Sequence, residues 1–364
     1  MTGEYRGFNL ETIGFDESEL DRLMAGGRSP TRDPDAAPPL EIVATCEKGE
    51  LWDLGEHRLL CGDATQAADV AALMGSDSAD CIWTDPPYNV NYGEKAAMLD
   101  TYDKGHRNTS TIVNDNLSPE AFYTFLHQAF LAMQSVCGAG APAYVCHAET
   151  EGHTFRRAFL NAGFYLSSCL IWRKNTLVLS RSDYHWQHEP ILYGWKEGDS
   201  HRWYGGRDKT SLQELQEPPC QKTGEDEYQI TLGERVLVIR GLQLTVEDLP
   251  GTIFHEEKPT RSLEHPTMKP VALIARMLRN STQLRNIVLD PFGGSGSTLI
   301  ACEQTGRRAR ILELVPHYCD VIIKRWQEFT GRPAIKHGTS QRFDSLVAKR
   351  RIVHGTSIRV TPGP

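Results

Sequence analysis

The distribution of apolar and polar positions predicts alternating strands and helices along most of the chain. Short apolar runs bounded by turn residues predict strands, whereas longer segments with apolar residues at helical spacing predict helices. The predicted strands are 51–55, 57–61, 80–85, 142–147, 164–173, 189–195, 286–290 and 310–313, and the predicted helices are 66–74, 118–135, 149–161, 265–280, 299–305 and 316–329. Repeated strand–helix–strand order favours an α/β fold with a doubly wound, mostly parallel sheet.

One stretch, between residues 196 and 264, breaks this alternation. Runs at 228–230 and 236–239 predict short strands there, and residues 212–264 carry eleven acidic side chains against five basic ones. That charge is unsuited to a general clamp on a polyanion. We interpret the stretch as an inserted small β-containing lobe. A separate contact role and a solvent-facing insertion without a role both stay open.

The two ends of the chain differ from the predicted sheet in composition. Residues 1–40 hold a short amphipathic piece and then a stretch rich in glycine and proline, which is typical of linkers. We expect this segment to be a poorly ordered or peripheral appendage. Residues 336–364 are basic and poor in apolar positions, which indicates a tail.

Length and composition limit the classes of protein to consider. A chain of 364 residues with 40% apolar content can bury a large core in about two domains. No apolar run is long enough to span a bilayer and the N-terminus lacks a signal pattern, so we expect a cytoplasmic protein without a membrane partner. The nine cysteines form no Cys-x-x-Cys pair, which favours reduced core thiols and predicts no metal site.

Net charge neither requires nor excludes a nucleic-acid partner. The formal charge is −8, but residues 1–41 are acidic and residues 321–364 are basic. Local basic surfaces would therefore have to supply phosphate contacts. The segment 202–209 interleaves basic and aromatic residues, and its candidates for such contacts are Arg202, Arg207 and Lys209.

The segment Asp85-Pro86-Pro87-Tyr88 carries the first chemical signal. It ends an apolar strand with a carboxylate, and open α/β sheets bind their ligands at the carboxyl ends of strands. The two prolines remove backbone donors, which leaves the carbonyls of Asp85 and Pro86 able to accept hydrogen bonds from a ligand. With the ring of Tyr88 nearby, these groups predict a socket for a planar group that bears an amino group.

A second signal lies at a glycine-rich turn after the strand 286–290. Asp290-Pro291-Phe292-Gly293-Gly294-Ser295-Gly296 leads into a helix, and the next strand ends in Glu313. Such a unit binds nucleosides, and an acid about 20 residues after the turn is placed to hold ribose hydroxyls. The spacing is neither Gly-x-Gly-x-x-Gly nor a phosphate loop, and Phe292 suits an apolar nucleoside and thioether. A nicotinamide oxidoreductase remains an alternative, and the acid Asp63 after the strand 57–61 could equally be a helix N-cap.

These motifs together resemble the amino-methyltransferases of DNA, which use S-adenosylmethionine. The resemblance covers about residues 49–335 and rests on Asp85 to Tyr88, on His265-Pro266-Thr267-Met268-Lys269-Pro270, on the glycine-rich turn and on Glu313. Because the catalytic motif precedes the cofactor motif, the chain is similar to the permuted β-class. The resemblance implies a Rossmann-like methyltransferase fold with a catalytic half at 41–196, a target-recognition insertion at 197–264 and a cofactor half at 265–335.

The resemblance also implies roles for individual residues. Asp85, Pro86, Pro87 and Tyr88 would be catalytic, and Tyr88 would stack on the target base. Residues that would bind the cofactor are Asp63 near its adenine, Thr267 and Lys269 near its methionine end, Asp290, Phe292, Gly293, Gly294 and Gly296 in the turn, and Glu313 at the ribose.

The implied reaction is methyl transfer to the exocyclic N6 of an adenine. Asp at position 85 favours N6-adenine over N4-cytosine enzymes, which more often begin this motif with Ser. The amino group would donate to the Asp85 carboxylate and the Pro86 carbonyl, which orients its lone pair towards the methyl group. Since this nitrogen is inaccessible inside a duplex, the base must be flipped out. An N4-cytosine enzyme and a regulator that binds cofactor and DNA without turnover are the alternatives.

The resemblance extends to partners and origin. It implies double-stranded DNA as the substrate, a bacterial or phage source, and a role in restriction–modification. It also allows a homodimer and a cognate restriction enzyme.

Overall fold

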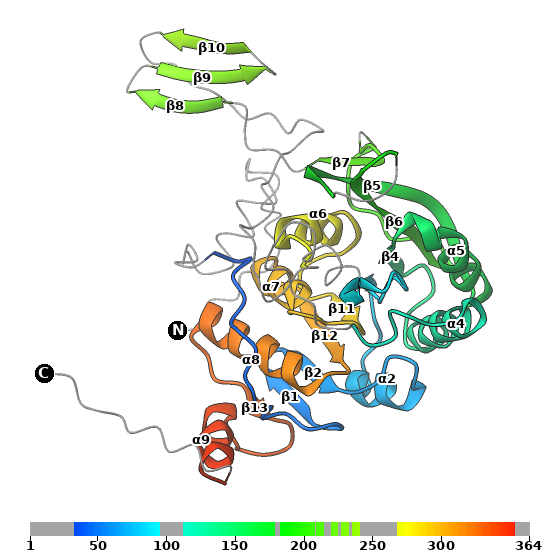
Figure 1. The fold of residues 1–364 in the computed structure, drawn as a ribbon, viewed down its shortest axis with the longest axis vertical. Helices are drawn as coiled ribbons and strands as arrows, with labels where there is room; N and C mark the ends of the chain where they lie inside the picture. The colour runs from blue at the N-terminus through cyan, green and yellow to red at the C-terminus, as the bar shows by residue number, and fades with distance from the viewer. Residues whose placement is uncertain are drawn as a thin grey trace, which may run out of the picture.

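A ten-stranded sheet forms the centre of the computed structural model, which describes residues 33–94, 112–178, 183–207, 209–214, 220–224, 227–232, 235–240 and 268–353 (Figure 1). The strands are β1 (Leu51–Leu54), β2 (His57–Cys61), β3 (Cys81–Thr84), β4 (Pro142–Cys146), β5 (Phe164–Val178), β6 (Trp186–Lys196), β7 (Leu212–Glu214), β11 (Ile287–Asp290), β12 (Arg308–Glu313) and β13 (Ile335–Lys336). Their order across the sheet is β13-β1-β2-β12-β11-β3-β4-β6-β5-β7.

The centre of this sheet is parallel. β2, β12, β11, β3 and β4 pair in parallel, whereas β6 is antiparallel to β4 and β5, and β1 is antiparallel to β2 and β13. All four residues of β3 are buried, as expected for a central strand with both faces covered. The predicted α/β fold with a mostly parallel sheet is confirmed, but β6 enters between β4 and β5, which alternation alone did not predict.

Helices cover both faces of the sheet. They are α2 (Ala67–Met74), α4 (Pro119–Ser135), the 3₁₀ turn η2 (Glu149–Glu151), α5 (Gly152–Asn161), α6 (Val271–Ser281), α7 (Ser297–Gln304), α8 (Pro316–Thr330) and α9 (Phe343–Val353). One apolar cluster packs α2, α4 and α5 on one face, and a second packs α6, α7 and α8 on the other. Ser118 caps α4 by accepting a hydrogen bond from the backbone of Ala121, and Pro119 starts the helix as predicted.

Two parallel neighbours join distant parts of the chain. β3 pairs with β11, with Cys81 opposite Val288 and Ile82 opposite Leu289. The corner at Asp85 and the glycine-rich turn after Asp290 therefore leave adjacent strands at the same edge of the sheet. This placement is the spatial condition on which the sequence interpretation depends, and it is met.

The predicted insertion begins later than residue 197. The backbone of Arg202 donates to Gly140 and that of Tyr204 to Asn280, so this stretch packs on the main sheet, and β7 pairs with β5. The expected small β-containing lobe is present as a separate antiparallel sheet of β8 (Cys220–Gly224), β9 (Glu227–Leu232) and β10 (Arg235–Arg240). The predicted strands at 228–230 and 236–239 lie in β9 and β10.

The expected C-terminal tail is partly folded. β13 pairs with β1, and α9 begins at Phe343, whose ring is fully buried and packs edge-on against Trp52. Low apolar content concealed this element because few side chains, Phe343 and Leu346 among them, bury it against the core. Of the expected N-terminal appendage, residues 1–32 lie outside the described residues, while Asp35 accepts a hydrogen bond from the backbone of Val271 at the start of α6. A helix able to cross a membrane is absent from the described part of the chain.

Replacing Phe343 tests whether the C-terminal segment belongs to the fold. Phe343→Ala is expected to lower the free energy of unfolding by about 3–5 kcal/mol, because it empties a fully buried site. Urea denaturation measures the change. Leu160→Ala, at a half-exposed position of α5, is the control and should change stability by less than Phe343→Ala. A loss at Phe343 no larger than at Leu160 would show that α9 is not part of the cooperative unit.

Candidate active site

Asp85 and Asp290 define the site at the carboxyl edge of the central strands. Asp85 follows β3 and Asp290 ends β11, and the hydroxyl of Thr84 donates to Asp290 Oδ1 at 3.1 Å. The predicted catalytic corner and the predicted cofactor turn therefore meet. Sheets of this kind bind ligands at such an edge.

The carboxylate of Asp85 has two strong partners. Lys269 Nζ lies 2.6 Å from Oδ2, and the hydroxyl of Tyr88 donates to Oδ1 at 2.6 Å. The Tyr88 ring packs edge-on against Phe155 and has the Lys269 ammonium 5.3 Å from its centroid. Pro86 is buried and Pro87 half-buried, which fixes the backbone of the corner. The stacking of Tyr88 on a base stays a prediction.

Glu189 is a site residue that sequence reasoning missed. Its Oε2 lies 3.1 Å from Lys269 Nζ and 3.5 Å from the Tyr88 hydroxyl, and its Oε1 contacts Lys174. The pair His188-Glu189 was visible in the sequence, but no local pattern showed that β6 runs beside β4 with its beginning extending past the end of that strand. Sheet order alone brings Glu189 to the site.

Burial and charge set the protonation of this cluster. Burial raises the pKa of Asp85, Lys269 opposes that effect, and the like charge of Glu189 adds to it. Burial also opposes ionisation of Glu189, yet Lys269 and Lys174 lower its pKa to about 2. The two carboxylates raise the pKa of Lys269 although burial acts against its charge. Lys269 is therefore a permanent cation between two acids.

The glycine-rich turn packs closely on the neighbouring strand. Gly294 and Gly296 have φ values of 52° and 86°, a region that L side chains rarely adopt. A Cβ on Gly293 would lie 2.4 Å from the side chain of Ile311 in β12. The shape of the turn therefore depends on its glycines.

The carboxylates of Asp290 and Glu313 fix this turn by accepting hydrogen bonds from its backbone. Asp290 accepts hydrogen bonds from the hydroxyls of Thr84 and Thr298 and from the backbone of Phe292. Glu313 accepts from the backbone of Gly294 at 2.8 Å and of Val315 at 2.9 Å. Burial raises the pKa of each carboxyl to about 7. Leu314 is a third backbone donor to Glu313, so Asp290 and Glu313 each have three donors and each retains a lone pair for one more.

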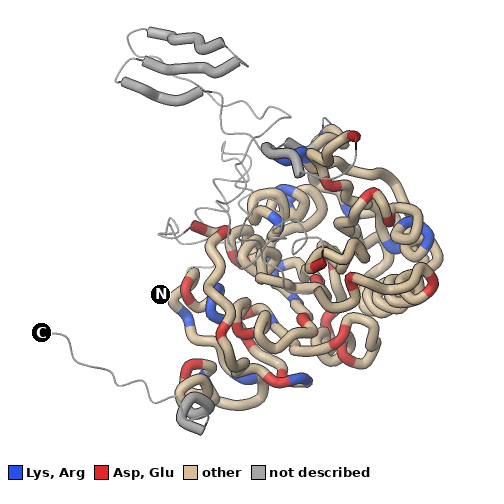
Figure 2. The backbone as a smooth tube through the Cα atoms, in the orientation of Figure 1, with Lys and Arg blue, Asp and Glu red and all other residues tan. Residues whose placement is uncertain are grey.

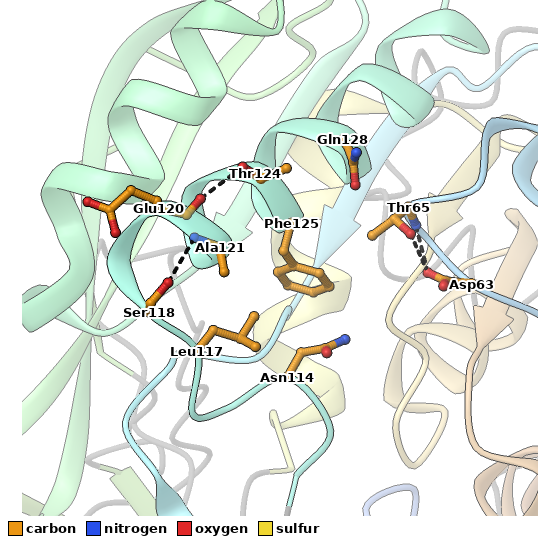
Figure 3. A pocket seen from close by; sticks show the side chains of 10 residues that line it. All are labelled: Asp63, Thr65, Asn114, Leu117, Ser118, Glu120, Ala121, Thr124, Phe125 and Gln128. Carbon is orange, nitrogen blue, oxygen red and sulfur yellow. Dashed lines mark hydrogen bonds between the residues drawn. The ribbon is translucent and has the colours of Figure 1, made fainter.

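A cavity of about 630 Å³ lies beside the turn (Figure 3). Asp63 and Thr65 line it from the segment between β2 and α2, and Leu117 and Phe125 line it from the start of α4. Phe125 also packs edge-on against Phe292 of the turn, with 5.8 Å between centroids. Asp63 Oδ1 accepts from the backbone and hydroxyl of Thr65, so it stabilises a turn, while Gln66 is the N-cap of α2. The N-cap interpretation of Asp63 is wrong.

Of the predicted phosphate contacts, Arg202 is the one that the structure places away from this edge. Arg202 pairs with Asp80 at 2.9 Å, and Asp80 precedes β3, so Arg202 lies at the opposite edge from Asp85. Its guanidinium is engaged with a carboxylate while its side chain is 33% exposed, and its contact with phosphate stays a prediction. Arg207 and Lys209 are exposed. Thr267 lies outside the described residues. Figure 2 shows acidic and basic residues interspersed along the described backbone.

Comparison with known proteins decides the family. The sequence model of the DNA methylase family, which spans N6 and N4 enzymes, matches residues 79–325. This chain belongs to that family. The match contains the catalytic corner and the glycine-rich turn, so the family resemblance expected from the sequence is confirmed, and with it the methyl donor S-adenosylmethionine.

Individual relatives of this methylase are distant. The type II methyltransferase M.HpaI of Haemophilus parainfluenzae is 23% identical over 311 residues, which cover 82% of this chain and 85% of the relative. Among solved structures, the M1.HpyAVI–SAM complex has 19% identity and a TM-score of 0.43, covering 73% of this chain and 98% of the other. The cytosine-N4-specific PvuII DNA methyltransferase has 12% identity and a TM-score of 0.48, covering 88% of this chain and 98% of the other.

The two buried acids predict a pH dependence of stability. Because the pKa of Glu313 is about 7 in the folded methylase and 4.5 ordinarily, the folded state holds more protons between these values. The stabilising effect is complete below about pH 4.5 and is lost as the pH rises through 7. Asp290 acts in the same direction from 3.8. Glu313→Gln should therefore reduce the fall in unfolding free energy between pH 5 and 8, measured by urea denaturation. The same fall in the variant would contradict this origin.

Proposed function

We propose that this methylase transfers the methyl group of S-adenosylmethionine to the exocyclic N6 of an adenine flipped out of duplex DNA. The observation that carries the proposal is the carboxylate of Asp85 at the sheet edge, next to the cofactor turn and already accepting hydrogen bonds from an ammonium and a hydroxyl. A carboxylate in that position can accept an amino N–H in the same way.

The residues around the turn fit the proposed cofactor. The glycines leave the backbone open, and the cavity lined by Asp63 and Phe125 lies next to Phe292. Glu313 is held by backbone donors and can accept a ribose hydroxyl with a remaining lone pair. S-adenosylmethionine, when bound, supplies an electrophilic methyl group on a positively charged sulfur. The chain supplies the relative position of the two ligands, because Asp85 and the glycine-rich turn follow adjacent parallel strands.

The proposed contribution of Asp85 is orientation and charge. Its carboxylate accepts one amino N–H while the Pro86 carbonyl accepts the other, which directs the nitrogen lone pair towards the donor. Positive charge develops on that nitrogen during transfer, and the ionised carboxylate stabilises it. The proton then leaves to solvent. Asp85 does not need to remove the proton before the transfer.

The target base is the finer part of the proposal. Asp rather than Ser at position 85 supports adenine. Mass spectrometry of nucleosides from duplex DNA treated with the enzyme and S-adenosylmethionine tests it, and long-read mapping of modified bases in an expressing host gives the target sequence. N6-methyladenine is expected. N4-methylcytosine would contradict the adenine assignment, and intact binding of cofactor and DNA without transfer would indicate a regulator.

The partners beyond DNA stay proposals of the same kind. A homodimer and a cognate restriction enzyme fit a restriction–modification role. Analytical ultracentrifugation with and without duplex DNA distinguishes a dimer from a monomer.

Removing the Asp85 carboxylate separates catalysis from cofactor binding. Asp85→Ala should lower the transfer rate by at least about 100-fold, since it removes the acceptor that orients the amino group. Calorimetry should find cofactor affinity nearly unchanged. Glu313→Ala is the paired variant and should weaken cofactor binding first. Surviving turnover with lost cofactor affinity in Asp85→Ala would contradict the assigned role.

The exposed basic side chains of Arg207 and Lys209, just before β7, provide a test of DNA contact. If Arg207 and Lys209 contact phosphate, replacing each with Gln should reduce the slope of log K against log salt by about 1. Arg202→Gln is the internal comparison, because its ion pair with Asp80 should leave this slope unchanged. Filter binding at several salt concentrations measures all three. Equal slopes for every variant would place the DNA elsewhere on the methylase.

A further inference from the structure

We propose that Glu189 is a positioning residue that retains the Lys269 ammonium, so that Asp85 can exchange its contact with this lysine for the amino group of the target base. The inference rests on the proposed function, because it concerns the same carboxylate. It adds a residue outside the recognised motifs and gives the lysine of the cofactor half a role next to the acceptor.

The exchange is favoured because each oxygen of the Asp85 carboxylate already has a partner with which an amino group must compete. Oδ2 contacts Lys269 and Oδ1 accepts the hydroxyl of Tyr88. An ammonium binds a carboxylate more strongly than a neutral amino group does, so Lys269 competes with the base. The side chain of Lys269 is only 5% exposed, so water cannot readily replace a lost carboxylate. A buried cation left unpaired would be strongly unfavourable.

Glu189 supplies the second acceptor that makes the exchange feasible. It lies 3.1 Å from Lys269 Nζ, so the ammonium can move towards it without losing its pairing. Lys174 contacts the other Glu189 oxygen and balances its charge. The cluster consists of two carboxylates, Asp85 and Glu189, and two ammonium groups, Lys174 and Lys269. Its net charge therefore stays zero when Asp85 contacts the amino group of the target adenine.

The architecture makes this position specific. β4 ends at Cys146, opposite Ile191 of β6, and the backbone of His147 donates to Pro190 beyond it. β6 begins earlier, and Glu189 still pairs with Trp172 of β5. The hairpin of β5 and β6 therefore projects past the shorter strand and carries both Glu189 and Lys174 to the catalytic corner.

Charged and titratable groups on every neighbouring element act on Asp85. They are Lys269 before α6, Glu189 on β6, Tyr88 after the corner, Asp290 on β11 and Cys146 on β4. Lys269 is the cation in this set and favours the ionised carboxylate, while Glu189 disfavours it. Loss of Lys269 should therefore leave the like charges of Asp85 and Glu189 without the cation they share, with the Tyr88 hydroxyl in contact with both, and loss of Glu189 as well should relieve their repulsion.

The test is a double-mutant cycle read as pH profiles. The variants are Lys269→Met, Glu189→Gln and the combination, and the readouts are kcat and kcat/KM for duplex DNA from pH 5 to 9. Lys269→Met should move the acid limb to higher pH, because Asp85 loses its cation and keeps the repulsion of Glu189. The acid limb of the double variant should lie at lower pH than that of Lys269→Met. At a pH on the acid limb, the double variant should be about 10-fold more active than Lys269→Met, which is the factor for one pKa unit.

Glu189→Gln alone should raise the KM for DNA about 10-fold, because Lys269 then stays on Asp85 and competes with the base. Cofactor affinity by calorimetry should be unchanged. Glu303→Gln is the matched control, since burial opposes ionisation there too while His57 and other partners lower its pKa to about 2. Glu303 contacts Trp326, away from Asp85, so its loss should lower stability without moving the pH profile.

Two outcomes overturn the proposal. One is a double variant with the same acid limb as Lys269→Met, and the other is a Glu189→Gln variant with the DNA KM and pH profile of Glu303→Gln. Carboxyl NMR of Asp85 gives the order of the acid limbs without turnover, so a destabilised or slow variant still decides the matter. The base methylated by the wild-type protein is read separately, so an error in the adenine assignment does not alter this test.

Discussion

The buried ion pair between Asp85 and Lys269 joins two parts of the chain that lie 184 residues apart. Lys269 lies just before α6, which packs against β3, and β3 and β11 are parallel neighbours whose carboxyl ends lie at one edge of the sheet. The same pairing places Asp290 and the glycine-rich turn beside Asp85. A methyl donor held at one strand end and an acceptor held at the next are then within reach of each other.

Burying charge at this edge has a cost that the local arrangement offsets. Desolvation acts against ionisation of Asp85, Glu189 and Lys269, and each is retained because oppositely charged groups lie within hydrogen-bond distance. Asp290 and Glu313 follow a different course. Among the residues that the structure describes, no cation stabilises their charge, so burial raises the pKa of each to about 7, and hydroxyl and backbone donors fix their orientation. One edge of the sheet thus holds a charged cluster at the Asp85 corner and weakly ionised acids beside the glycine-rich turn.

Local sequence patterns predicted the elements well and their neighbours less well. The alternation of strands and helices, the start of α4 at Ser118 and the glycine turn all depend on residues close in the chain, and each was predictable. Glu189 was missed because its place depends on β6 inserting between β4 and β5, which no local period encodes. The ion pair of Arg202 with Asp80 was likewise not predictable from a local pattern, since the two residues are distant in sequence. What the sequence could not predict was the long-range pairing of strands, and the place of Glu189 depends on that pairing.

The most direct measurement is a crystal structure of the methylase with an unreactive S-adenosylmethionine analogue that carries an amine in place of the S-methyl group. The account predicts that the analogue follows the glycine-rich turn and that its amine points to the Asp85 corner, leaving room for an amino nitrogen about 3–3.5 Å from the transferred position. An analogue bound away from the turn, or with its amine directed away from Asp85, would contradict the account.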